Sequence, residues 1–151
     1  MSDNSWTNLV INFLINPSIN GTAYSKLFDE GLIAGLDGMP YGHTPGLKNI
    51  TKDFISKIIK DFPKEDVMNY KMTSIVLEGK EFMSSPFLNP QLAWILGSRA
   101  LSKEEHDGVA FAIKSNKCII LGVKFNAEKS DINVMNKAIV TFKQNLCNSG
   151  F

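Results

Sequence analysis

Residues 31–46 read GLIAGLDGMPYGHTPG, a glycine-rich stretch that could form either a phosphate-binding loop or a β-hairpin. Leu32–Leu36 is short, apolar and uncharged. Asp37-Gly38 follows it and is typical of hairpin turns, because these residue types tolerate positive φ. A dinucleotide-binding loop needs G-x-G-x-x-G directly before a helix, and a P-loop needs Gly-Lys-Ser/Thr; neither pattern is present. The stretch therefore predicts a hairpin whose return strand is Met39–His43.

Three other segments place apolar residues at the i, i+3, i+4 spacing of an amphipathic helix. A residue type that commonly caps helices precedes all three segments, and proline follows the two that come first in the chain. A further short helix is expected around Ala23–Asp29. The three periodic segments are residues 6–14 with Ser5 as cap and Pro17 as end, residues 50–62 with Asn49 or Thr51 as cap and Pro63 as end, and residues 134–146 with Ser130 or Asp131 as cap.

Short apolar runs separated by turn residues predict the remaining strands. The runs are residues 74–77 and 80–84 as one hairpin, residues 93–96, and residues 108–114 and 117–125 as a second hairpin, with a polar connection over 98–107. The order of helices and antiparallel strands predicts an α+β fold in which helices flank an antiparallel sheet. With no repeat or linker visible, residues 1–151 are expected to form a single domain.

Composition excludes several classes of function. The chain has 151 residues, and its 16 Lys+Arg against 15 Asp+Glu leave no global field to attract nucleic acid. No apolar run approaches the length of a membrane span, and the N-terminus has no basic region of a signal peptide. We therefore expect a cytoplasmic protein. Its two cysteines, Cys118 and Cys147, are expected to stay reduced, because they could pair only if the fold brought them together.

No catalytic constellation can be argued from the residues. The two histidines, His43 and His106, lie in polar segments, and neither has a neighbouring nucleophile and orienting partner. His106 follows two glutamates and precedes an aspartate, but a metal site needs three or four converging ligands, usually from separate segments. We therefore expect no enzyme activity and no cofactor, with a metal enzyme centred on His106 as a distant alternative.

Aromatic residues stand at both ends of the chain. Trp6 begins the first predicted helix, and Phe151 follows a glycine after the last one. If these two helices lie side by side, the two rings can form an exposed aromatic platform. Such platforms bind polyproline II segments, which are preformed and lose little entropy on binding.

The sequence resembles the profilin family over most of its length. Similar motifs are Ser5-Trp6, the hairpin Leu32–Tyr41, Ile59–Phe62, Leu77–Phe82, Asn136-Lys137 and the Ser-Gly-aromatic run that ends at Phe151. Each motif is weak alone, and their order and spacing carry the resemblance. It implies a sheet with the N- and C-terminal helices on one face and a further helix on the other.

The resemblance also implies a function. It suggests a monomeric protein that binds monomeric actin, regulates its polymerisation, and docks proline-rich segments and phosphoinositides. The implied actin-binding residues are Lys80, Arg99, Phe111, Asn136 and Lys137. The implied proline-binding residues are Trp6, Tyr41, Asn145 and Phe151.

Some positions depart from the family pattern. Leu9 and Asn145 stand where the family has further ring side chains, which reduces the aromatic area and weakens the expected proline binding. Glu81 stands where the family has a basic residue, and Lys80 lies beside it. These departures indicate a divergent member, such as one from an actin-bearing archaeon or a deep-branching eukaryote. The alternative from the fold class is a longin- or roadblock-like trafficking or GTPase-regulating module, which would form homodimers.

Overall fold

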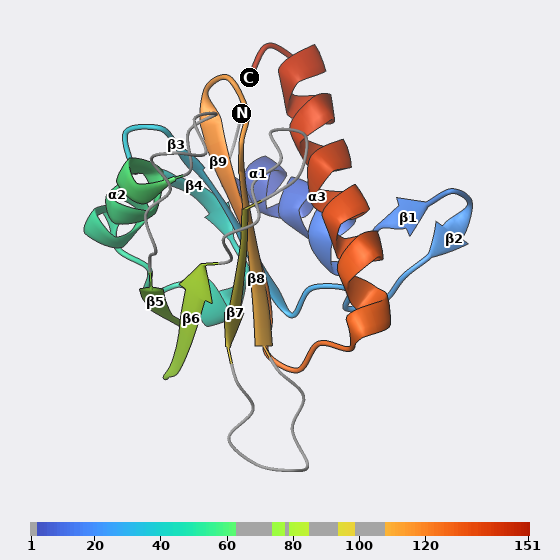
Figure 1. The fold of residues 1–151 in the computed structure, drawn as a ribbon. Coiled ribbons are helices and arrows are strands. Elements are labelled where there is room, and N and C mark those ends of the chain that lie inside the picture. The colour runs from blue at the N-terminus through green and yellow to red at the C-terminus, as the bar shows by residue number, and fades with distance from the viewer. Residues whose placement is uncertain (1–2, 63–73, 78, 85–93, 99–107) are drawn as a thin grey trace, which may run out of the picture.

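The structure, a computed structural model, describes residues 3–62, 74–77, 79–84, 94–98 and 108–151. Its main element is a seven-stranded antiparallel sheet with strand order β4-β3-β9-β8-β7-β6-β5 (Figure 1). The strands are β3 (Glu30–Gly35), β4 (Pro40–His43), β5 (Ser74–Leu77), β6 (Lys80–Ser84), β7 (Trp94–Ser98), β8 (Gly108–Lys114) and β9 (Cys118–Lys124).

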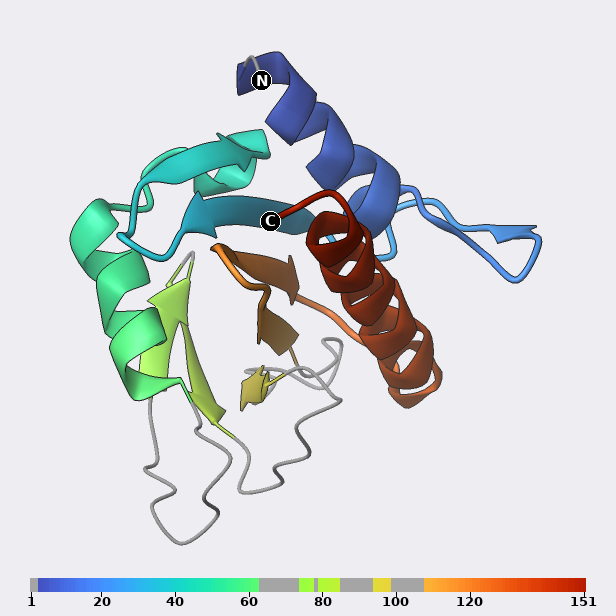
Figure 2. The same cartoon turned by 90° about the horizontal axis from the view of Figure 1, so that it is seen from above.

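The helices cover the two faces of this sheet. They are α1 (Asp3–Val10), which continues as the π-helical turn η1 (Ile11–Ile15), the short 3-10 helix η2 (Pro45–Leu47), α2 (Lys52–Asp61) and α3 (Lys129–Asn148). Figure 2 shows α2 on one side of the sheet and α3 on the other. The expected α+β arrangement, with the first and last helices on one face and a further helix on the other, is confirmed.

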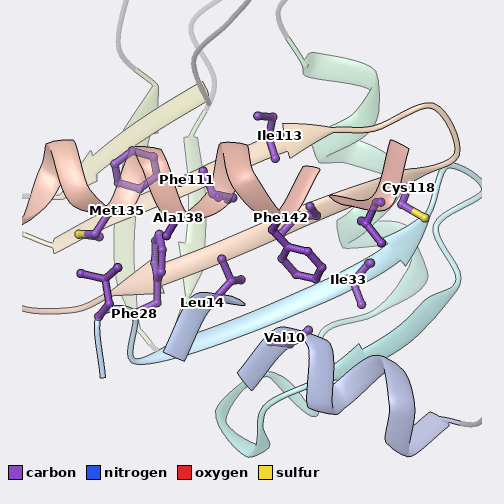
Figure 3. Packing of buried hydrophobic residues seen from close by; sticks show 14 of the residues in the cluster. Val10, Leu14, Phe28, Ile33, Phe111, Ile113, Cys118, Met135, Ala138 and Phe142 are labelled. Atoms are coloured by element: carbon purple, nitrogen blue, oxygen red, sulfur yellow. The ribbon is translucent and has the colours of Figure 1, made fainter. Parts of the chain in front are cut away.

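Two separate hydrophobic clusters hold the layers together. Because successive side chains of a strand point to opposite faces, one strand contributes to both clusters. On β3, Ile33 faces α1 and α3, whereas Leu32 and Ala34 face α2. The cluster under α1 and α3, drawn in Figure 3, includes Val10, Leu14, Phe28, Phe111, Met135, Ala138 and Phe142. The cluster under α2 includes Ile55, Ile58, Leu77, Phe82 and Leu121.

The hairpin predicted from residues 31–46 is present as β3 and β4. The two strands pair antiparallel, with Leu32 opposite His43. The turn differs from the two-residue type that Asp37-Gly38 suggests, because it spans residues 36–39 and only Gly38 has a positive φ, of 91°. The Asp37 side chain accepts a hydrogen bond from the Met39 N–H at 3.0 Å, which stabilises the turn from within.

Apart from the short helix expected around Ala23–Asp29, the other predicted strands and helices agree with the structure except for details at their ends. Thr51 caps α2, since its hydroxyl accepts the Phe54 N–H at 3.1 Å. Ser5 was expected as a cap but lies inside α1, which begins at Asp3. The cap of α3 is Glu128 rather than Ser130 or Asp131. Asp131 instead completes a capping box with Glu128, each side chain accepting a backbone N–H of the other.

The short helix expected around Ala23–Asp29 is absent. Residues 18–23 form a small separate hairpin, β1 (Ser18–Ile19) and β2 (Thr22–Ala23), which projects from the body beyond α3 in both views. Asn20 and Gly21 both have positive φ at its turn, a backbone conformation that glycine and asparagine tolerate best. The turn chemistry of Asn20-Gly21 therefore overrides the weak helical spacing of this segment.

Candidate functional site

Trp6, Tyr41 and Phe151 lie together, although they come from α1, β4 and the residues after α3. The Trp6 ring centroid lies 5.1 Å from that of Tyr41, with the rings tilted by 33°. It lies 5.1 Å from that of Phe151, with the rings nearly perpendicular at 83°. Both distances are within the range of favourable aromatic pairs. We refer to these three residues as the aromatic site.

Trp6 is placed by the close contact of α1 with β4. Gly42 lies opposite it, and a Cβ built on Gly42 would come within 2.8 Å of the Trp6 Cβ and within 2.6 Å of the Thr7 nitrogen. Only a residue without a side chain allows the helix to approach the strand this closely. Trp6 belongs to the cluster under α1 and α3, and its side chain is 6% exposed.

Tyr41 contributes the polar group of the aromatic site. Burial raises the pKa of its hydroxyl above the ordinary value of 10.0, and the carboxylate of Asp37 and the thiol of Cys118 raise it further. All three effects disfavour the negative phenolate. Tyr41 therefore keeps a neutral hydroxyl, able to donate or accept a hydrogen bond, at every physiological pH.

Phe151 is placed by the end of α3. Gly150 has a φ of 93°, its N–H donates to the carbonyl of Cys147 at 3.1 Å, and the Phe151 N–H donates to the carbonyl of Leu146 at 2.8 Å. These two bonds are those of a Schellman motif, in which a left-handed residue turns the chain back over the last helical turn. The motif directs Phe151 toward Trp6.

A second contact holds Phe151 to the β8–β9 turn. Its main-chain oxygen accepts the Lys117 N–H at 2.6 Å and the Ser115 hydroxyl at 3.0 Å. The same Ser115 oxygen accepts the Cys118 N–H at 3.0 Å, so the turn and Phe151 share one hydrogen-bond network. We call the contacts of Ser115 and Lys117 with Phe151 the clasp.

The other residues expected near this site are polar or partly covered. Asn145 lies on the last turns of α3 with an exposed side chain, and Leu9 is half-buried against the cluster under α1 and α3. The described part of the chain thus assembles three of the four residues that the resemblance implies for proline binding into direct ring contact.

The residues expected for actin binding lie in different environments. Lys137 is exposed and Asn136 half-buried on the first half of α3. Lys80 is half-buried, and its ammonium donates to the carbonyl of Phe125 at 3.0 Å. Arg99 lies outside the described residues.

Phe111 was expected on a binding face, but its side chain is 0% exposed. It packs edge-on against Phe28, with ring centroids 5.7 Å apart. In this structure Phe111 is therefore a core residue of the cluster under α1 and α3, and its ring offers no surface to a partner.

Sequence reasoning missed an exposed apolar pair on β5 and β6. Val76 is 58% exposed and Met83 is 46% exposed. The register Val109–Gly97–Met83–Ser74 across β8, β7, β6 and β5 places Met83 on the face of the sheet where Val109 packs under α3. Alternation along a strand places every second residue on the outward face. The sequence does not show which of the apolar residues of β5 lie on that face.

No metal site is present among the residues that the structure describes, since no three His, Cys, Asp or Glu side chains come close enough to hold an ion. His43 makes a 2.9 Å contact from its Nδ1 atom to the carbonyl of Thr44. His106, the residue on which the metal alternative was centred, lies outside the described residues. In the same described parts, no helix is long and apolar enough to cross a membrane.

Comparison with known proteins gives a consistent result for the fold. No protein-family model and no curated protein sequence matches the chain. Among solved structures, rat profilin 2a is similar with a TM-score of 0.66 at 16% identity, covering 100% of both chains. Mouse profilin IIa in complex with a double repeat from the FH1 domain of mDia1 has a TM-score of 0.59 at 14% identity, covering 82% of this chain and 89% of that one.

Acanthamoeba castellanii profilin II is also similar, with a TM-score of 0.50 at 13% identity, covering 83% of this chain and 89% of that one. All three similar structures are profilins, and all share fewer than one residue in five with this chain. These likenesses agree with the strand order and with the helices on both faces of the sheet. The chain is a divergent protein with the profilin fold.

Proposed function

We propose that this protein binds monomeric actin and regulates its polymerisation, and that the aromatic site binds proline-rich segments weakly. The observation that carries the proposal is the meeting of Trp6, Tyr41 and Phe151 from three separate elements on a profilin fold. We expect a monomeric, cytoplasmic protein without enzymatic activity. Light scattering should give a mass near 16.8 kDa; a homodimer would favour the longin- or roadblock-like alternative instead.

The proposed actin-binding face combines the first half of α3 with the outward side of β5 and β6. Lys137 supplies an exposed charge, and Val76 with Met83 supplies an apolar area on the same sheet face as α3, toward the β5 edge of the sheet, where their side chains are exposed. Protein interfaces commonly combine a few apolar anchors with a polar rim. Glu81, opposite Val76 in the register, adds an exposed carboxylate to this face. Binding there would shield one end of the actin monomer and restrict growth to the other filament end.

Charge reversal on α3 tests the actin-binding face. We expect Lys137→Glu to weaken binding to monomeric actin about tenfold, which corresponds to about 1.4 kcal/mol. The assay is the concentration of protein needed to halve the rate of actin assembly in a fluorescence polymerisation experiment. Lys57→Glu is the matched control, since Lys57 is an exposed lysine on α2, on the other side of the sheet. Equal activity of the Lys137→Glu variant and the wild type would refute the assignment of this residue.

Binding of proline-rich segments is supported by the ring geometry and by the complex that mouse profilin IIa forms with an FH1 repeat. Stacking area is small here, because Leu9 and Asn145 add no ring. We therefore expect a dissociation constant on the order of 1 mM for a decaproline peptide. Tyr41→Ala should abolish the nuclear magnetic resonance shifts caused by the peptide, whereas Lys137→Glu should leave them unchanged.

Phosphoinositide binding is the third expectation, and the exposed lysines of α2 are the surface that would serve it. Lys52, Lys57 and Lys60 are all exposed. A basic residue near an anionic membrane surface contributes about 1 kcal/mol. Sedimentation with vesicles that contain phosphoinositide, compared with neutral vesicles, tests this proposal. Equal partitioning onto both vesicle types would contradict it.

A further inference from the structure

The central ring of the aromatic site is covered in this structure. Trp6 has the largest ring of the three, yet its side chain is only 6% exposed. Tyr41 lies beside it at a shallow tilt of 33°, and Phe151 meets it almost at a right angle. A proline ring that stacks on an indole needs an open face of that indole. With both neighbours in place, the described structure leaves Trp6 almost no surface for a ligand.

Of the two covering residues, Phe151 has the greater freedom to move. Tyr41 lies within β4 at a bulge, between Gly42 and Pro40, which pair with Ile33 and Ala34 of β3 and so hold its backbone on both sides. Phe151 lies beyond α3 and follows Gly150, which is exposed and has no atom within 4 Å of the place where a Cβ would lie. The described hydrogen bonds that hold Phe151 are those of the clasp and the Schellman motif, and neither is strand pairing.

We propose that the Phe151 ring is a cover that closes the aromatic site in the free protein, and that a proline-rich segment binds after this ring leaves Trp6. The proposal rests on the proposed proline-binding function of the same site. A ligand that binds only the open form has an apparent dissociation constant equal to the intrinsic value divided by the open fraction. The closed cover therefore lowers the affinity for proline-rich segments, and any change that opens it raises that affinity.

The clasp determines how firmly the cover is closed. The Ser115 hydroxyl donates to the main-chain oxygen of Phe151, and the Lys117 N–H donates to the same oxygen. Ser115→Ala removes the bond from the hydroxyl to Phe151 and leaves the backbone bond of Lys117 in place. It also removes the bond that the Ser115 oxygen accepts from the Cys118 N–H within the turn. The loss of one ordinary hydrogen bond between Phe151 and the turn, worth about 1 kcal/mol, raises a small open fraction about fivefold. The apparent dissociation constant for the peptide falls by the same factor.

The experiment measures the exposure of Trp6 and the binding of a decaproline peptide in the same variants. The chain has two tryptophans, so a Trp94→Phe background leaves Trp6 as the single indole. In that background we compare the parent, Ser115→Ala, Phe151→Ala and the control Thr141→Ala, which changes an exposed residue of α3. Acrylamide quenching of fluorescence reports the exposure of Trp6, and circular dichroism verifies that each variant folds.

We expect quenching to increase from the parent to Ser115→Ala and again to Phe151→Ala, with Thr141→Ala equal to the parent. Peptide binding should become tighter in Ser115→Ala. Unchanged quenching in Ser115→Ala would overturn the proposal, and so would exposure of Trp6 combined with weaker peptide binding, since Phe151 would then be a wall of the site. If quenching follows the expected order but no variant binds the peptide, the cover stands and the proline-binding function fails.

Discussion

Gly42→Ala should loosen the contact between α1 and the sheet. A Cβ at this position would lie 2.6 Å from the Thr7 nitrogen, 2.7 Å from the Trp6 carbonyl carbon and 2.8 Å from the Trp6 Cβ. All three distances are below 3.0 Å, which real Cβ atoms essentially never reach. Two of the three contacted atoms belong to the helix backbone and cannot rotate away. The helix itself must shift, and Trp6 shifts with it.

The size of the effect follows from this geometry. Overpacking a well-filled site costs about 1–3 kcal/mol. Because the obstacle at Gly42 is main chain, we expect the upper end, about 3 kcal/mol. For a chain of this size, that loss lowers the melting temperature by about 6–12 °C. The same shift changes the contact of Trp6 with Tyr41, so peptide binding at the aromatic site should also weaken.

Urea unfolding followed by circular dichroism measures the change in the free energy of unfolding. Gly97→Ala is the matched control, because the nearest atom to a Cβ there is the Gly108 carbonyl oxygen at 4.0 Å. The control should be neutral or more stable by about 0.4–1 kcal/mol, through reduced freedom of the unfolded chain. A Gly42→Ala variant within about 0.5 kcal/mol of the wild type would refute the reasoning, since it would mean that α1 adapts without cost.

Three further predictions concern the same end of the molecule. Gly150→Ala should lower the free energy of unfolding by about 1 kcal/mol, because φ is 93° at this position. No atom lies within 4 Å of the added Cβ, so the loss comes from the backbone conformation alone. An unchanged midpoint of urea unfolding would contradict the Schellman assignment. Folding raises the pKa of the Tyr41 hydroxyl. The neutral hydroxyl therefore makes a contribution to the free energy of unfolding that is fully present below about pH 10 and is lost as the pH rises through the folded pKa. Between about pH 9 and pH 12 the free energy of unfolding should therefore fall less in Tyr41→Phe than in the wild type. If the two proteins lose stability in parallel over this range, the raised pKa of Tyr41 is contradicted. A thiol reagent should label Cys147, which is half-buried, faster than Cys118. Cys118 is fully buried, and its burial raises the pKa of its thiol, so less of the reactive thiolate is present. Equal labelling rates of the two cysteines in mass spectrometry would disprove this order.

Periodicity in the sequence was sufficient to predict most of the sheet and the helices. The apolar runs of residues 74–77 and 108–114 follow strand patterns strong enough to give type and extent, and residues 50–62 show the 3.6-residue spacing of α2. Periodicity failed at Asn20-Gly21, where two residues with positive φ decide the local structure. Such a turn has no helical or strand repeat to detect.

The candidate site was predictable in part, for a different reason. Trp6 and Phe151 stood out because aromatic residues at chain ends are unusual, and the ring contact between them is present. Phe111 was implied as an actin-binding residue by the family resemblance, but its side chain lies in the core. Because β8 is buried on both faces, alternation along that strand could not have shown which environment Phe111 occupies. The clasp was not predictable, since it joins residues far apart in the sequence through two main-chain groups and one side-chain hydroxyl.

The separation of the two hydrophobic clusters by the sheet has an evolutionary consequence. Side chains that point to opposite faces of a strand do not touch, and substitutions without shared neighbours act on stability almost independently. Mutations under α2 can therefore accumulate without repacking the layer that positions Trp6 and Phe151. A lineage can replace one half of its interior while selection holds the other. Such independence is compatible with a chain that is 16% identical to rat profilin 2a and shares its fold.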